Sequence, residues 1–180
     1  MRTADDVLRF WFVEHGKDDW FGGKAEFDAE LAKEFAETHA AVARAEAWDW
    51  RSTPKGRLAE IIVLDQFSRQ LHRGEADAFA QDKMATALTQ EAIAVGADQE
   101  IPIDRRMFLF MPFQHSESLV IQEQGVRYFE QFGPDMLKFM TDHRDCIAKF
   151  GRFPFRNQAL GRESTEAEIA YTAEQGARVF

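Results

Sequence analysis

A short basic and aromatic segment near the C-terminal end is the first place in this sequence where side chains suggest chemistry. Residues 149–164 read KFGRFPFRNQALGRES and hold four basic side chains and three phenylalanines. Arg is the side chain best suited to bidentate pairing with a carboxylate or a phosphate. The segment therefore predicts either a site for an anionic group or a loop that its phenylalanines seat on the core.

The charge of the chain is distributed unevenly. The formal net charge is −9, from 22 Lys and Arg against 31 Asp and Glu. Residues 143–162 carry five basic side chains and one acidic one, a local charge of +4 that leaves −13 for the rest. Because nucleic-acid binding draws its affinity from surplus positive charge, the total argues against a general nucleic-acid binder. The local surplus instead predicts a small anionic molecule or an acidic peptide segment as the partner.

A second candidate lies in the middle of the chain. Asp65 and Arg69 are four residues apart on a predicted helix with apolar surroundings, so they share one face of it. A carboxylate on a buried face needs a partner, and Arg69 can supply one. The pair predicts either a buried ion pair that fixes helix packing or the floor of a polar pocket.

Two histidines complete the set of candidates. Helix capping explains Ser116 and Glu117, since Ser caps a helix and a first-turn Glu complements its dipole. Capping does not explain His115, which is therefore a candidate general base or ligand. His143 lies on the apolar stripe of its predicted helix, where it is either a hydrogen-bonded core residue or part of the site.

The elements that must position these residues are helices. Helical periodicity and helix caps recur along the chain, and no segment alternates with period two, so we expect an all-α fold of about seven or eight helices. The clearest starts are a Thr3 cap, Thr53 or its neighbour Ser52 before Pro54, and a capping box from Thr165. The run from Ile61 to Leu64 is apolar all round, which predicts a central place in the core.

One predicted helix contains a proline. Pro112 is expected to end or kink a helix that begins at Asp104. The sequence then predicts a break that holds Gln114 and His115, followed by a new helix that Ser116 caps. Further along, Asp82 is expected to cap its own helix.

Length and composition bound the remaining possibilities. With 180 residues and 45% hydrophobic content, we expect one all-α domain over residues 1–180. No apolar stretch approaches the roughly 20 residues that cross a bilayer, and no basic-then-apolar leader opens the chain, so we expect a cytoplasmic protein with no membrane partner. The single cysteine, Cys146, cannot form an internal disulfide or a thiolate metal site. With no glycine-rich phosphate loop, the sequence predicts no cofactor and no metal.

Four blocks of sequence resemble a known family. They are DQFSRQ (65–70), FLFMPFQHSE (108–117), HRDCIAKFGRFPFRN (143–157) and LGREST (160–165), and with FWF near the start they resemble the bacterial proteins catalogued as domain of unknown function 924. The resemblance covers essentially the whole chain and implies an all-α fold related to tetratricopeptide-repeat helical hairpins, without an activity. Ser68 stands where the family commonly has Pro, and Phe155 where it commonly has His.

These observations lead to three hypotheses. The first is a helical protein whose groove binds an acidic peptide or a small anionic ligand through Arg69, His115, His143, Arg152, Arg156, Asn157 and Arg162. The second is a hydrolase acting on an anionic substrate, with His115 as base and Asp65 or Glu117 as its orienter. The third is a buried structural network of these same residues, with the function on another surface.

Overall fold

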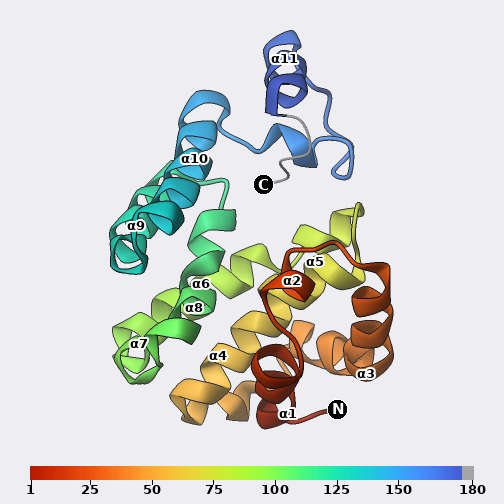
Figure 1. Cartoon of the computed structure of the whole chain (residues 1–180), viewed down its shortest axis with the longest axis vertical. Coiled ribbons are helices and arrows are strands. Elements are labelled where there is room, and N and C mark those ends of the chain that lie inside the picture. Colours follow the sequence, from red (N-terminus) through yellow and green to blue (C-terminus); the bar gives the residue numbers. More distant parts are fainter. Residues whose placement is uncertain (176–180) are drawn as a thin grey trace. The chain divides into compact units, whose positions relative to one another are not determined.

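The structure of the protein is a computed structural model that describes residues 1–175 (Figure 1). Within these residues the chain forms helices, turns and irregular connections and no strand, which confirms the all-α class. The chain divides into two compact units. The first unit contains residues 1–73 and 77–109, and the second contains residues 74–76 and the chain from Phe110 onward. The single domain and the tetratricopeptide-like arrangement stay predictions.

The first unit contains the helical segments from α1 to α8, except that the first residue of η4 and the end of α8 belong to the second unit. In chain order these are α1 (Ala4–Arg9), the π turn η1 (Phe10–Glu14), α2 (Lys17–Trp20), α3 (Ala25–Ala43), η2 (Trp48–Ser52), α4 (Pro54–Ile62), the π turn η3 (Val63–Phe67), α5 (Ser68–Leu71), η4 (Ala76–Phe79), α6 (Asp82–Ala94), α7 (Ala97–Glu100) and α8 (Ile103–His115).

Local capping chemistry starts α1 and α4 where the sequence predicts. The Thr3 hydroxyl accepts a hydrogen bond from the Asp6 amide, and the Asp6 carboxylate accepts one from the Thr3 amide, which is a complete capping box. Thr53 accepts from the Gly56 amide at 3.1 Å, and Pro54 occupies the first helical position. Asp82 differs from the expectation, because it is the first residue of α6 and Gln81 takes the cap position.

The core of the first unit is aromatic and aliphatic. Trp11 is fully buried and stacks on Trp20, with ring centroids 5.4 Å apart. The ring centroids of Phe67, which lies in η3, and of Phe108, which lies in α8, are each 5.6 Å from that of Trp11. The apolar run from Ile61 to Leu64 has no exposed surface, so its predicted central position is confirmed.

The second unit contains the end of α8 and the segments after it. These are α9 (Leu119–Phe129), η5 (Glu130–Phe132), α10 (Pro134–Phe150), η6 (Pro154–Arg156) and α11 (Glu166–Gln175). Helices α9 and α10 pack closely at Gly125, where an added Cβ would lie 2.5 Å from Cε of Met140. Within the described residues, no helix combines the length and the apolar character needed to cross a membrane.

The predicted break at Pro112 is wrong. Helix α8 continues through Pro112 to His115, and α9 begins at Leu119 with Ser118 rather than Ser116 in the cap position. A proline removes one helical hydrogen bond, but the side chains on both sides of it are buried, with Phe108 fully buried and Phe113 1% exposed. Packing of this face therefore outweighs the local preference, and His115 ends a helix.

Candidate functional site

Residues 149–164, here called the basic loop, begin with the last two residues of α10 and continue beyond it. The helix ends at Gly151, whose φ of 71° lies in the left-handed region that favours glycine. Phe153 is fully buried in a cluster with Cys146 and Ile147 of α10. Its ring also meets the imidazole of His143 edge-on, with centroids 5.7 Å apart. Apolar packing therefore fixes the loop on α10 and holds the backbone that carries the polar side chains of the loop.

A bidentate ion pair joins the basic loop to the turn before α9. Arg162 donates from Nη1 to Oε2 of Glu117 at 2.7 Å and from Nη2 to Oε1 at 2.9 Å. The amide of Phe153 donates to the same Oε1 at 2.7 Å. Burial alone would raise the pKa of Glu117, but the hydrogen bonds from Arg162 and Phe153 outweigh burial and lower it. Glu117 is therefore held as a carboxylate whose two oxygens are already engaged.

A second bidentate pair joins the loop to α11. Arg152 donates from Nε and Nη2 to the two oxygens of Glu168, at 2.6 and 2.8 Å. Glu168 also accepts from the Thr165 amide, and Thr165 accepts from the Glu168 amide, so the predicted capping box is confirmed. The hydrogen bond from Arg152, which outweighs the effect of burial, and the bonds from Thr165 lower the pKa of Glu168 to about 2.

Arg156 is the most deeply buried arginine of the loop, at 3% exposed. Its guanidinium lies over the ring of Phe153, with Cζ 4.5 Å from the centroid. Its Nη2 donates to the backbone carbonyl of His115 at 3.0 Å. The Arg156 side chain therefore links η6 to the last turn of α8.

Asn157 closes the basic loop on itself. It is 2% exposed, accepts from Nε of Arg162 at 2.9 Å and donates to the hydroxyl of Ser164 at 3.0 Å. The Arg162 amide also donates to the Asn157 carbonyl at 2.8 Å. Asn157 thus orients the arginine that binds Glu117.

The two histidines lie close together in the second unit. His115 is 8% exposed and His143 2%, with ring centroids 6.5 Å apart. Nδ1 of His143 lies 2.8 Å from the carbonyl oxygen of Phe139, which can only accept, so Nδ1 carries the hydrogen. Its Nε2 then accepts from the side-chain amide of Gln114 at 3.3 Å. Both nitrogens of a neutral His143 are engaged, as in a hydrogen-bonded core residue.

Gln122 belongs to this polar cluster, although the sequence does not single it out. It is fully buried on α9 and donates from Nε2 to the carbonyls of Gln114 and Ser116, each at 2.7 Å. Its Oε1 has no partner among the described residues. The sequence does not identify Gln122, because a buried glutamine on a helix cannot be distinguished from an exposed one by residue type alone.

Asp65 and Arg69 form a separate cluster in the first unit. Asp65 lies in the π turn η3 and is fully buried. Arg69 lies 3.3 Å from Oδ1 of Asp65, donates to its carbonyl at 2.6 Å and binds Asp82 through Nη2 at 3.0 Å. Burial lowers the pKa of Arg69, but Asp65 and Asp82 outweigh burial and raise it. The predicted pair is present, and Asp82 is a partner that the sequence does not reveal.

The structure therefore divides the predicted residues between the two units. The first unit holds Asp65 and Arg69. The second unit brings together His115, Glu117, His143, Arg152, Arg156, Asn157 and Arg162. Among residues 1–175, no three or more His, Cys, Asp or Glu side chains gather in a way that could hold a metal ion.

The fold and this cluster define an all-α protein whose C-terminal unit is built around an arginine-rich loop. The chain belongs to the family described as bacterial protein of unknown function (DUF924), whose model matches residues 7–176. It is similar to the solved structure of a protein of unknown function from Agrobacterium tumefaciens, at 38% sequence identity. The TM-score is 0.91, and the match covers 96% of this chain and 97% of that one. The comparison with curated proteins gives no match.

Proposed function

We propose that the second unit binds a small anionic ligand, or the carboxylates of an acidic peptide segment, at the exposed edge of the basic loop. The observation that carries the proposal is the state of Arg152. Its Nε and Nη2 bind Glu168 and the Glu163 carbonyl, while Nη1 has no partner among the described residues and the side chain remains 30% exposed. Arg152 is thus held rigidly with two N–H groups left to donate.

Two neighbouring arginines of the basic loop also favour anion binding. Arg162 is 23% exposed, and all three of its guanidinium nitrogens donate, to Glu117, Asn157 and the Phe153 carbonyl, which leaves one N–H of Nη1 to donate among the described residues. Arg156 adds positive charge from a buried position beside the loop. Guanidinium groups that are already immobilised lose little side-chain entropy when an anion binds. Arg152 and Arg162 are the contact residues in this proposal, and Arg156, Asn157, His115 and His143 position them.

A thermal-shift and calorimetric titration tests the proposal with three probes: inorganic phosphate, citrate and hexaglutamate. We expect at least one probe to bind saturably and to raise the melting temperature, since a ligand of the folded state stabilises it. Arg152→Gln should weaken that binding tenfold or more. Arg144→Gln is the matched control, because Arg144 is 34% exposed on α10 and pairs with its neighbour Asp145. Absence of saturable binding, or equal binding by Arg152→Gln, contradicts the proposal.

The structural-network hypothesis is the second candidate, and the two bidentate pairs favour it. Arg152 and Arg162 direct their paired donors at Glu168 and Glu117 of the chain itself. For the hydrolase, by contrast, one of the two predicted orienters of His115 is already engaged, because the oxygens of Glu117 accept from Arg162 and Phe153. Under the structural hypothesis, Arg152→Gln lowers stability and no anion binds the wild type.

The cytoplasmic location remains part of the proposal, without a membrane or nucleic-acid partner. The net charge of −9 supports the exclusion of nucleic acid. The buried free thiol of Cys146 is compatible with a reducing compartment.

A further inference from the structure

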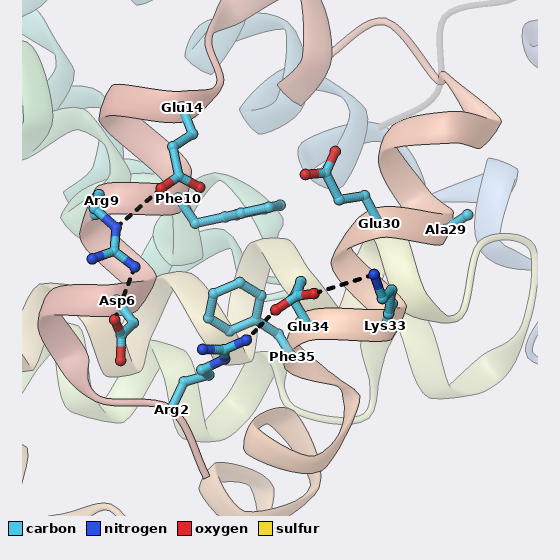
Figure 2. A pocket seen from close by; sticks show the side chains of 10 residues that line it. All are labelled: Arg2, Asp6, Arg9, Phe10, Glu14, Ala29, Glu30, Lys33, Glu34 and Phe35. Atoms are coloured by element: carbon cyan, nitrogen blue, oxygen red, sulfur yellow. Dashed lines mark hydrogen bonds and ion pairs between the residues drawn. The ribbon is translucent and has the colours of Figure 1, made fainter.

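The first unit contains an open cleft of about 470 Å³ between its N-terminal segment and α3 (Figure 2). Its base is formed by the rings of Phe10, from η1, and Phe35, from α3, whose centroids are 4.8 Å apart. Each phenylalanine is 3% exposed, so the rings are firmly embedded and only a small part of each is exposed. The volume falls in the range of about 300–1,000 Å³ that is usual for small-molecule pockets.

Positive charge is in excess at one side of the cleft. Arg2 forms an ion pair with Glu34, and Nζ of Lys33 lies 3.8 Å from the same carboxylate. Two cations therefore share one anion. Lys33 is 82% exposed, so its ammonium can move toward a ligand at little cost. Figure 2 shows these three residues on the Phe35 side of the cleft.

Negative charge is in excess at the other side. Arg9 is shared between Asp6 and Glu14, with an N–O distance of 3.0 Å to each. Glu30, 53% exposed, lies 3.6 Å from Nε2 of His15, which is charged only when it is protonated. Figure 2 shows Glu14 and Glu30 on the Phe10 side, with the Glu30 carboxylate directed over the cleft.

The π turn η1 contributes to this arrangement. Its widened turn is closed by a hydrogen bond from the His15 amide to the Phe10 carbonyl at 3.2 Å. In an α-helix the residues that share a face are three or four positions apart. Here Arg9 and Glu14 are five apart and still pair, and both residues line the cleft. Single π turns inside helices occur frequently at functional sites.

We propose that this cleft binds a zwitterion with an apolar body, of the class of a short apolar peptide. The ammonium group lies between Glu14 and Glu30, and the carboxylate accepts from Arg2 and Lys33. The apolar body lies over Phe10 and the aliphatic stems of the surrounding side chains. A ligand with a single charge satisfies one side and leaves the opposite excess uncompensated, so the two-sided distribution favours a zwitterion.

Calorimetric titration with three related dipeptides tests which charges the cleft requires. The probes are Leu-Leu, its N-acetyl form, which lacks the ammonium, and its C-terminal amide, which lacks the carboxylate. We expect saturable binding of Leu-Leu and at least tenfold weaker binding of each blocked form. No binding of Leu-Leu, or equal binding of all three, overturns the proposal.

Two variants assign the binding to this cleft. Glu30→Gln should weaken Leu-Leu tenfold or more, and Lys33→Gln should also weaken it; both residues are largely exposed, so the fold is retained. Glu37→Gln is the matched control, since Glu37 is 89% exposed on the same helix outside the cleft. Wild-type affinity in both cleft variants overturns the proposal. Arg152→Gln should leave Leu-Leu binding unchanged, which separates this site from the basic loop.

Discussion

Arg162 and Glu117 are 45 residues apart in the sequence and share two parallel hydrogen bonds, at 2.7 and 2.9 Å. The pair ties the loop after α10 to the turn before α9. About a quarter of each side chain is exposed, so the pair is partly shielded from solvent and its geometry is bidentate. Because the Phe153 amide donates to the same carboxylate, loss of Glu117 frees both a guanidinium and a backbone donor.

Glu117→Gln should lower the free energy of unfolding by about 2 kcal/mol. The neutral amide cannot accept from both Arg162 nitrogens, and removing one partner leaves a poorly compensated charge. Urea denaturation followed by circular dichroism measures the change. Arg144→Gln, which breaks a more exposed ion pair with Asp145, should change stability by at most about 1 kcal/mol. Equal effects of the two variants would show that the Glu117 pair is not a structural link.

Gly56→Ala should destabilise the protein, against the usual trend. Glycine to alanine inside a helix ordinarily stabilises it by about 1 kcal/mol. At Gly56, however, an added Cβ would lie 2.0 Å from the carbonyl oxygen of Trp50 and 3.0 Å from Oγ1 of Thr53. The start of α4 or the η2 turn must shift, so we expect a loss of about 2 kcal/mol. Lys55→Ala, at the adjacent exposed position, should leave the urea midpoint nearly unchanged; a stabilised Gly56→Ala contradicts the close approach.

The features that the sequence predicts correctly depend on neighbouring residues. The Thr3 and Thr53 caps and the Thr165 capping box each involve groups within three positions along the chain. Pro112 shows where such rules fail. The local preference for a break there is weaker than the packing of the buried α8 face, and packing is a property of residues distant in sequence.

For the same reason, the sequence predicts only part of the candidate site. The sequence identifies the arginines of the basic loop by their local density, but not their partners. Glu168 reads as a capping residue, and its pairing with Arg152 across 16 residues follows no periodic pattern. The sequence does not predict the cleft of the first unit either, because Glu30 and Lys33 fit the pattern of the solvent-exposed face of an ordinary amphipathic helix.

Stability should fall as the pH drops from 6.5 toward 4 because of His39. Burial lowers the pKa of His39 to about 4, with a smaller contribution from nearby His72 and an opposing one from Asp77. Its Nε2 lies 2.7 Å from the hydroxyl of Ser68, which itself donates to the Leu64 carbonyl, so Nε2 is the donor. Below pH 6.5 the unfolded chain protonates His39 and the folded chain does not, so the contribution of neutral His39 is lost progressively.

The expected loss from this group is up to about 3 kcal/mol between pH 6.5 and 4, and it levels off below pH 4 as the folded state also becomes protonated. Urea denaturation at several pH values measures it. His39→Gln retains a donor toward Ser68 but cannot titrate, so its stability should depend less on pH over this window. Parallel pH profiles for the wild type and His39→Gln would show that His39 does not cause the loss.

Glu168 should control stability in a lower pH window. Hydrogen bonds from Arg152 hold its folded pKa at about 2, below the ordinary 4.5, so its contribution is complete above pH 4.5 and is lost as the pH falls toward 2. Glu168→Gln should therefore be less stable than the wild type at pH 6, and the difference should shrink steadily between pH 4.5 and 3. Glu166→Gln, at an exposed first-turn position of the same helix, should show no such convergence. A constant difference between wild type and Glu168→Gln across this window would mean that Arg152 does not stabilise the ionised carboxylate.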